Sequence, residues 1–372
     1  MPADLQSLPI LVDTPERFAS LLDDLRHQSQ IGVDTESNSL HAYHERVCLV
    51  QFSTPDDDYV LDPLAINDLS PLGAIFSSAS IEKIFHAAEY DIICLQRDYH
   101  FEFAHLFDTM QAGRILGRRQ AGLDRLLEEK FAVKVNKRFQ KADWAVRPLS
   151  RDLLMYARLD THYLIPLHEM LKAELEQHKL WQLAQEDFRL ACRTNGSKPK
   201  VEVPAWTRYS SRKDLTVRDL TILDSLLRWR EGVASALDRP PFKVLDDDRL
   251  LAIAAARPST PAELDAIGLT SRQMQQWGPT ILEAVIQGVK GPLVRRNKPP
   301  RPDEIYLRRL DKLKEWRKKA AGGMDVESDV VLPRPFLLEL AAKGPDEVRS
   351  VLQASPWRLE HYGEQIQKVL GG

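Results

Sequence analysis

The sequence predicts an α/β domain built on a mixed sheet, followed by two small all-helical domains. Short apolar runs rich in β-branched residues alternate with helical patterns over the first 110 residues. From about Gly122 onward, the apolar residues keep helical spacing. The periodicity fails at residues 194–199 and again at 296–302, which divides the 372 residues into three units. That number agrees with a domain size of roughly 150 residues.

The predicted sheet has five strands, which are residues 31–35, 47–52, 59–61, 83–85 and 105–107. Pro55 and the aspartates after it mark a turn between the second and third strands. Helices are predicted behind the last two strands, over residues 88–97 and 110–116. Hairpin-joined strands followed by strand–helix alternation indicate a mixed sheet.

Two further helices complete the first domain. Residues 123–131 carry apolar side chains at helical spacing. Ser150 is the predicted N-cap of a longer helix, whose apolar positions run from Leu153 to Met170. These positions cover more than one face, as expected for a helix packed on a sheet.

Both C-terminal blocks are predicted to be helical. The first has helices at residues 217–230, 247–255, 261–266, 271–277 and 279–289. The second has helices at residues 306–320, 334–342, 345–353 and 358–370. Each block carries an early tryptophan near a basic cluster, Trp229 in one and Trp316 in the other. The shared length and order indicate a diverged tandem duplication.

Composition excludes several classes of protein. With 43% hydrophobic and 28% charged residues, the chain is not globally disordered. No apolar stretch approaches the roughly 20 residues of a membrane-spanning helix. The N-terminus from Met1 to Asp4 lacks the features of a secretory signal, and the three cysteines are far apart. We therefore expect a cytoplasmic location. The lack of a long heptad pattern predicts a monomer.

Charge is distributed unevenly along the chain. Residues 1–100 contain 17 acidic and 5 basic residues, whereas residues 295–319 contain 11 basic and 4 acidic ones. An acidic unit followed by basic ones indicates a polyanionic partner. The alternative is that such charge runs are simply solvated faces.

Acidic residues occur at the predicted carboxyl end of the first strand. Asp34 and Glu36 are two residues apart, so their side chains point to the same face. Open α/β sheets commonly bind ligands at this end of a strand. An Asp-x-Glu triplet alone is a weak signal, since Asp325 and Glu327 form a second one. The alternative is a strand end that enters solvent.

Two later segments add further candidates. Asp91 lies in the first turns after the fourth strand, and Tyr156 and Asp160 share a helical face. The alternatives are a salt bridge from Asp160 to Arg158 or Arg125, and core packing for Tyr156.

Four carboxylates at one site would repel one another unless cations intervene. Oxygen ligands without His or Cys suit Mg²⁺ or Mn²⁺. Two such ions, about 3.5–4 Å apart, serve in phosphodiester hydrolysis. A nearby tyrosine hydroxyl can orient the attacking water.

The three segments resemble the motifs of the DEDD exonucleases, and the Tyr-x-x-x-Asp form of the third resembles the DEDDy branch. The other branch has a histidine at the position of Met155. The whole chain is similar to the bacterial ribonuclease D family, and its helical blocks look like HRDC domains. Ala87 is one departure, because an asparagine often stands there in the wider group of proofreading exonucleases.

The resemblance implies an RNase H-like exonuclease domain over residues 1–197 and HRDC domains over 212–292 and 302–372. It implies that Asp34, Glu36, Asp91 and Asp160 bind two Mg²⁺ or Mn²⁺ ions, and that Tyr156 positions the water. The implied activity is 3′–5′ exoribonuclease hydrolysis that releases 5′ mononucleotides. The implied substrates are RNAs with a single-stranded 3′ end, for tRNA 3′-end maturation and the processing of small structured RNAs.

Two rival functions remain open at this point. One is a DNA-directed 3′–5′ exonuclease with the same chemistry, and the other is an inactive RNA-binding protein with this fold. In all three cases basic side chains would contact the phosphate backbone. The first predicted basic surface contains Arg208, Arg212, Lys213, Arg218, Arg228 and Arg230, and the second is the 295–319 cluster. Trp206 or Tyr209 would stack on bases or, alternatively, pack the linker.

Overall fold

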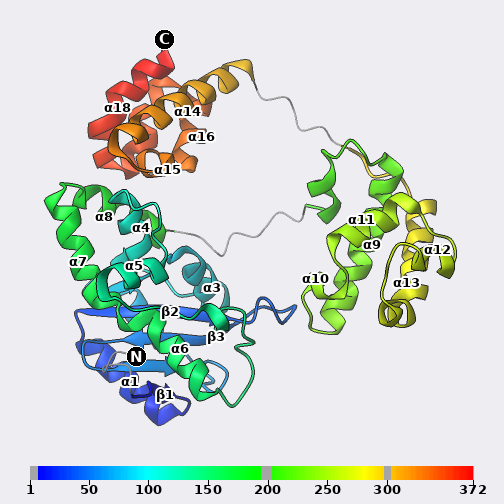
Figure 1. Cartoon of the computed structure of the whole chain (residues 1–372). Coiled ribbons are helices and arrows are strands. Elements are labelled where there is room, and N and C mark those ends of the chain that lie inside the picture. Colours follow the sequence, from blue (N-terminus) through cyan, green and yellow to red (C-terminus); the bar gives the residue numbers. More distant parts are fainter. Residues whose placement is uncertain (1–6, 194–202, 297–302, 372) are drawn as a thin grey trace. The chain divides into compact units, whose positions relative to one another are not determined.

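The computed structural model describes residues 7–193, 203–296 and 303–371 (Figure 1). Its chain divides into two compact units. One comprises Met1–Ser37, Val47–Ser197 and Pro302–Gly372, and the other Asn38–Arg46 and Lys198–Arg301. The predicted break at 194–199, and that at 296–302 apart from Arg296, lie outside the described residues. The domain boundaries therefore stay a prediction.

The first unit contains a six-stranded sheet in the order β1-β4-β3-β2-β5-β6. Its strands are β1 (Ile10–Val12), β2 (Gln30–Ser37), β3 (Val47–Ser53), β4 (Asp58–Leu61), β5 (Glu82–Phe85) and β6 (Leu106–Asp108). The β2–β3 and β3–β4 pairs are antiparallel, and the β1–β4, β2–β5 and β5–β6 pairs are parallel. The predicted mixed sheet is confirmed, with β1 as an additional edge strand.

Helices cover both faces of this sheet (Figure 1). Every residue of β3 is buried, in keeping with the apolar run at residues 47–50. The helices of this part are α1 (Pro15–His27), α2 (Leu72–Phe76), α3 (Glu89–Tyr99), α4 (Thr109–Ile115), α5 (Leu123–Phe131), α6 (Arg151–His162), α7 (Leu164–Gln177) and α8 (Trp181–Cys192). Helices α1, α2 and α8 were not predicted.

The single long helix predicted after Ser150 is wrong in one respect. Ser150 does cap α6, because its hydroxyl accepts from the Leu153 N–H at 3.3 Å. The helix ends at His162, however, and α7 begins at Leu164. Pro166 explains the break, since it has no N–H to continue the α6 hydrogen bonds and is tolerated in the first turn of α7. The apolar face of α7 is therefore independent of the face that carries Asp160.

The second unit is helical around its own apolar core. Its helices are α9 (Val217–Ala236), α10 (Pro241–Val244), α11 (Asp247–Ala256), α12 (Pro261–Asp265) and α13 (Ser271–Lys290). Helix α13 replaces two predicted helices, because Pro279 is accommodated inside it. The segment Asn38–Arg46 belongs to this unit, and its Tyr43 and His44 N–H groups donate to Asp238 at 3.0 and 3.1 Å.

The C-terminal block belongs to the first unit. It contains α14 (Glu304–Met324), α15 (Ser328–Val331), α16 (Arg334–Lys343), α17 (Val348–Val351) and α18 (Pro356–Gly371). The helix predicted over residues 345–353 is broken, with a short 3₁₀ turn on either side of α17.

The two helical blocks share internal contacts, as the predicted duplication requires. In each, the early tryptophan donates to the last helix, from Trp229 to Thr280 at 3.0 Å and from Trp316 to Gln365 at 3.3 Å. The following arginine in each block donates to the carbonyl of a leucine 15 residues later. These bonds are Arg230 to Leu245 at 2.7 Å and Arg317 to Leu332 at 2.9 Å.

A buried polar network joins the C-terminal block to α8. Arg358 is fully buried, and its guanidinium lies 2.7 Å from Asp187. Its N–H groups donate four hydrogen bonds, to Asp187 Oδ2, to the Val330 and Val331 carbonyls and to the Ser355 hydroxyl. Glu186 of α8 accepts from the backbone N–H of Trp357 and so caps α18. The buried arginine of the C-terminal block and the buried carboxylates of α8 therefore neutralise each other.

We predict that Arg358→Met lowers the free energy of unfolding by about 3–5 kcal/mol, because the substitution leaves buried carboxylates uncompensated. Urea denaturation of the full chain measures this change. The matched control is Lys343→Met, which breaks the exposed pair with Glu339 and is expected to lower stability much less. Equal losses in both variants would contradict a stabilising role of the network.

Candidate active site

The first two acidic residues project from β2 beyond its parallel neighbour. The β2–β5 pairing ends at Gly32 and Ile84, whereas the β2–β3 pairing continues to Ser37. Asp34 and Glu36 therefore stand at an edge that β5 does not cover. This is the crevice outside the carboxyl end of a strand where α/β sheets commonly bind ligands.

Helix α6 approaches β2 closely at this edge. A Cβ at position 32 would lie 3.0 Å from the Thr161 carbonyl and 3.3 Å from the Leu164 Cβ. Glycine at this position thus permits the contact, and the contact brings Asp160 to the side of β2 that carries Asp34.

A buried ion pair fixes α6 against the sheet. The Arg158 Nε and His162 Nδ1 lie 2.5 and 2.8 Å from Asp58 of β4. The Ser53 hydroxyl donates to Asp58 at 2.5 Å, and its oxygen lies 2.7 Å from the Thr161 hydroxyl. Burial works to raise the pKa of Asp58, but the hydrogen bonds and positive charges around it lower the pKa overall. The position of Asp160 is therefore set by a charged network on the opposite side of α6.

The predicted site residues line one pocket of about 440 Å³, which Asp34, Glu36, Asp91, Tyr156 and Asp160 share. Carboxylate oxygens of Asp34, Glu36 and Asp160 all lie within 4.8 Å of one another, close enough to hold one cation. Asp91 enters the pocket from the first turn of α3 and is 6% exposed. These donors fit a hard divalent cation.

Burial and mutual repulsion raise the pKa values of these acids. Burial is the larger cause for all four, and it raises the pKa of Asp91 and of Asp160 to about 7. The pKa values of Asp34 and Glu36 rise well above their ordinary range, with the charges of neighbouring acids as the second cause. The pocket thus concentrates negative charge that favours either protons or cations.

The structure does not support the salt-bridge alternative for Asp160, but it does support the packing alternative for Tyr156. The salt bridge from Asp160 to Arg158 or Arg125, considered as the alternative to a functional role, is not seen. The ion pair shown for Arg158 is with Asp58, and Arg125 lies 3.2 Å from Glu128. Tyr156 does pack among apolar side chains, with ring contacts to Trp144 and Phe139, while it also lines the pocket.

Sequence reasoning missed several pocket residues. His86, Asp124, Lys137 and Gln140 also line it, and Lys137 lies 2.7 Å from Asp124. Lys137 and Gln140 belong to a short segment between α5 and α6 that has no helical or strand periodicity. The only sequence signal in this segment is a polar run before the Trp144 region. Lys137 and Gln140 could therefore be identified as pocket residues only from the structure.

The first predicted basic surface is wrong in part. Arg230 is buried, with its guanidinium 2.8 Å from Asp247. Arg218 donates to two backbone carbonyls, while Arg208, Arg212 and Arg228 each pair with an aspartate. Trp206 is 7% exposed and packs in the core of the second unit, so it is not available for stacking on bases. Aspartates two and four residues away compensate the charges of Arg212 and Arg228, and Asp247 compensates those of Arg208 and Arg230 from farther along the chain.

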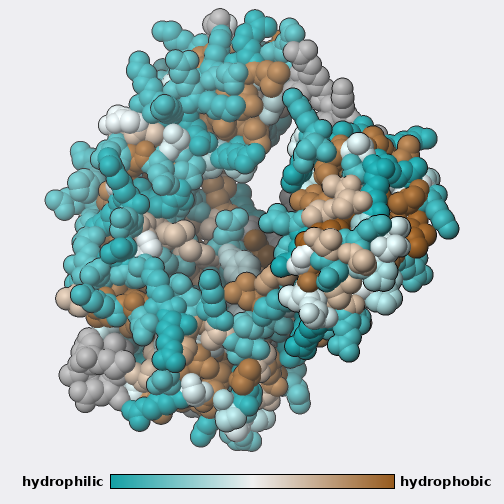
Figure 2. All heavy atoms as spheres, turned by 45° about the vertical axis from the view of Figure 1, so that its right-hand side comes forward, coloured by the Kyte–Doolittle hydropathy of each residue, from teal (hydrophilic) through white to brown (hydrophobic). Residues whose placement is uncertain are grey.

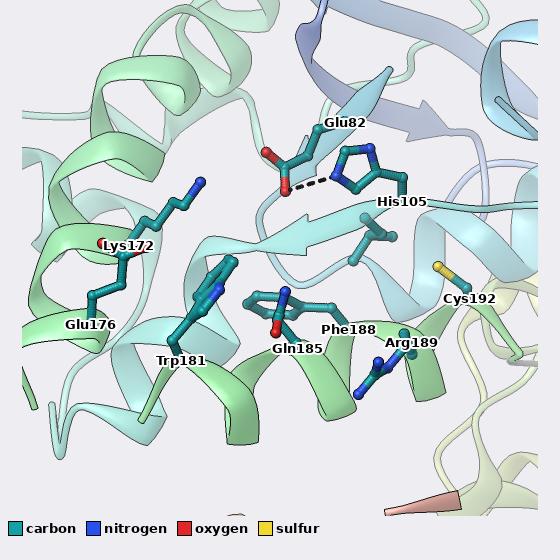
Figure 3. A pocket seen from close by; sticks show the side chains of 10 residues that line it. Glu82, His105, Lys172, Glu176, Trp181, Gln185, Phe188, Arg189 and Cys192 are labelled. Carbon is teal, nitrogen blue, oxygen red and sulfur yellow. Dashed lines mark ion pairs between the residues drawn. The ribbon is translucent and has the colours of Figure 1, made fainter. Parts of the chain in front are cut away.

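A second cavity of about 480 Å³ lies at the edge strand β6, between this strand and helices α7 and α8 (Figure 3). Glu82 and His105 lie next to each other in its wall, with the Glu82 carboxylate 3.5 Å from the His105 Nε2, and Trp181 and Phe188 form another part of the wall (Figure 3). None of the predicted site residues lines this cavity. It is therefore separate from the acidic pocket.

The surface is mostly hydrophilic on the face shown in Figure 2. Among the helices that the structure describes, none is sufficiently long and apolar to cross a membrane.

Two family models match the chain. Residues 9–176 match a 3′–5′ exonuclease family, and residues 219–285 and 307–370 match the HRDC domain. These matches agree with the predicted order of one catalytic and two helical domains.

A curated relative, the exosome complex exonuclease RRP6 of Saccharomyces cerevisiae, is 34% identical over 280 residues. That match covers 71% of this chain but 38% of the relative. Human exosome complex component 10 is 32% identical over 264 residues, which cover 67% of this chain and 30% of that protein. The chain thus spans well under half the length of these relatives.

Two solved structures have the same fold. Escherichia coli RNase D has a TM-score of 0.70 at 24% identity, with 98% of this chain and 99% of that chain covered. The catalytic core of Trypanosoma brucei RRP6 has a TM-score of 0.65 at 26% identity, with coverage of 78% and 85%.

The raised pKa values predict an unusual pH dependence of stability in metal-free buffer. An acid whose pKa is higher in the folded state destabilises the fold as pH rises between its ordinary value of 3.8 and about 7. Asp160→Asn should therefore match or exceed the parent in melting temperature at pH 8 in EDTA. The gain should disappear near pH 4. Melting temperatures of both proteins across this range provide the measurement, and a variant less stable than the parent at pH 8 would contradict the account.

Proposed function

Because residues 9–176 belong to the 3′–5′ exonuclease family and two HRDC domains follow them, we propose that this chain is a metal-dependent 3′–5′ exoribonuclease of the RNase D and RRP6 type. The observation that carries the proposal is the convergence of Asp34, Glu36, Asp91 and Asp160 on one pocket beside Tyr156. An RNA-binding protein without activity has no need for clustered acids that repel phosphate.

Asp34, Glu36 and Asp160 would hold a divalent cation between their carboxylates, with Asp91 contributing from α3. We propose Mg²⁺ or Mn²⁺, two per site. Such ions supply the charge that activates a water molecule and offsets the charge on the leaving 3′ oxygen. The protein's part is to hold the acids ionised and close together, and cation binding would lower the raised pKa values that oppose this.

Tyr156 would orient the attacking water. Burial, then the charges of Asp160, Glu36 and Asp34, raises the pKa of its hydroxyl. The hydroxyl therefore stays protonated at neutral pH and acts as a hydrogen-bonding group, not as a base. Its ring is held between Trp144 and Phe139, which fixes the direction of the hydroxyl.

Lys137 and Gln140 would contact the phosphate that is cleaved. Both line the acidic pocket, and Lys137 supplies a positive charge at its rim. The Lys137 ammonium forms an ion pair with Asp124 at 2.7 Å. A phosphate would therefore compete with the Asp124 carboxylate for this ammonium.

Helix α14 would bind the RNA backbone. Arg308, Lys318 and Lys319 are exposed and form no ion pair in the part of the chain that the structure describes. Lys314 of the same helix pairs only with Asp311, at 3.3 Å. Phosphate binding by such cations is independent of sequence and sensitive to salt. We therefore expect this helix to bind the RNA backbone whatever its sequence.

The substrate would be RNA with a single-stranded 3′ end, including tRNA precursors and small structured RNAs. Successive hydrolysis from the 3′ hydroxyl would release 5′ mononucleotides. We also propose that the enzyme is a cytoplasmic monomer with domains at residues 1–197, 212–292 and 302–372.

A time course on 5′-labelled RNA with a single-stranded 3′ tail tests this function. With Mn²⁺ we expect a ladder that shortens from the 3′ end, and no ladder with EDTA or with Asp34→Ala. A DNA oligomer of the same sequence, run in parallel, should be degraded more slowly. Intact RNA that still shifts on a native gel would support the RNA-binding alternative, and faster DNA degradation would support the DNA-directed one.

For Tyr156→Phe, we expect kcat on the same RNA to fall on the order of 100-fold, because the water loses its orienting group. Mn²⁺ affinity should be unchanged, since no carboxylate is altered. Single-turnover kinetics and calorimetric titration measure the two effects. Turnover equal to that of the parent would remove Tyr156 from the mechanism.

A further inference from the structure

Asp91 is the site carboxylate with the least support from its own segment. It lies on α3, and the N-cap residue of that helix, Ala88, provides no side-chain cap. The residue before the cap, Ala87, has a φ of 64°, in the left-handed region that is unfavourable for a residue with a Cβ. The start of α3 therefore requires support from elsewhere in the fold to stay in this conformation.

Asp108 provides that support from the end of β6. Its Oδ1 accepts from the Ala87 N–H at 3.1 Å, and its Oδ2 accepts from the Ala88 N–H at 2.9 Å. The same carboxylate is the N-cap of α4, where it accepts from Met110 and Gln111 at 2.9 and 3.0 Å. One carboxylate, 8% exposed, thus caps two helices and fixes α3 to the neighbouring strand.

Thr35 makes the second connection. Its hydroxyl donates to the Asp91 Oδ1 at 2.5 Å. In the chain Thr35 stands between Asp34 and Glu36, so this bond ties the carboxylate on α3 to the strand that carries the other two acids. A donor on one oxygen restricts the rotation of the carboxylate.

We propose that Asp108 and Thr35 are positioning residues for Asp91, with Asp108 setting the place of α3 and Thr35 setting the orientation of the carboxylate. Neither residue belongs to the four acids and the tyrosine of the predicted motifs. The assignment rests on the proposed function, because it takes Asp91 to be a metal ligand. Groups of this kind usually alter metal affinity or activity about 10–100-fold when they are removed.

The test compares Thr35→Val, which keeps the shape but removes the hydroxyl, with Thr35→Ser, which keeps the hydroxyl. Calorimetric titration with Mn²⁺ in the absence of RNA reports on the site independently of turnover. We expect Thr35→Val to weaken Mn²⁺ binding about 10-fold or more, and Thr35→Ser to bind like the parent. On RNA, kcat of Thr35→Val should fall at saturating substrate while KM stays unchanged. Mn²⁺ affinity equal to that of the parent would overturn the role of Thr35.

Asp108→Asn tests the second connection, because an amide nitrogen cannot accept the Ala88 N–H. We expect weaker Mn²⁺ binding with an unchanged circular dichroism spectrum. A lower melting temperature with parental Mn²⁺ affinity would make Asp108 a merely structural residue and overturn its assignment. If Asp108→Asn does not fold, the Thr35 pair decides the proposal.

The outcomes separate this proposal from the proposed function. A parent that binds Mn²⁺ without degrading RNA would overturn the function, while the Mn²⁺ affinities of the variants still decide the roles of Thr35 and Asp108. A parent that degrades RNA beside an equally active Thr35→Val would overturn the positioning role alone. No Mn²⁺ binding by the parent would overturn both.

Discussion

The repulsion between four carboxylates at one end of β2 is the constraint on which the rest of the structure depends. Burial and proximity raise the pKa values of all four, so the metal-free fold must hold them together against a free-energy cost. Each segment that carries an acid has its own anchor. Strand β2 is held by the sheet, α6 by Asp58, and α3 by Asp108 and Thr35. Asp58 and Asp108 do not line the pocket, whereas Thr35 does. Because these anchors hold the three segments in the metal-free fold, we expect cations to replace protons there without movement of the backbone.

The two helical blocks have different relations to the rest of the chain, although both match the HRDC domain. The C-terminal block shares a buried network with α8 and belongs to the same compact unit as the sheet. The first block forms its own unit, and its arginines are largely paired with its own aspartates. The two blocks thus keep the same internal contacts, such as those of Trp229 and Trp316. The C-terminal block is packed against the sheet domain, and its helix α14 carries cations that form no ion pair among the described residues.

The sequence was sufficient for the fold class, because strand periodicity, capping and apolar spacing are local properties. The sequence also predicted that Asp34, Glu36, Asp91, Tyr156 and Asp160 form one site, since these residues and their order resemble the motifs of a known family. Their roles as ligands stay predictions. Local patterns failed where a distant partner decides the outcome. The burial of Arg230 and the support from Asp108 each depend on contacts that spacing does not encode. The break at Pro166 is different, because the proline is a local signal that the apolar spacing on either side of it obscured. Lys137 and Gln140 escaped notice for the same reason.

Diffraction from crystals of the full chain soaked in Mn²⁺, with anomalous scattering used to locate the metal, tests the central claim most directly. The account predicts Mn²⁺ in contact with carboxylate oxygens of Asp34, Glu36 and Asp160, with Asp91 oriented toward the pocket by the Thr35 hydroxyl. The positions of α3 and α6 should match those in metal-free crystals. Mn²⁺ bound only elsewhere, or a site that forms only after α6 or α3 moves, would contradict a preformed acidic centre.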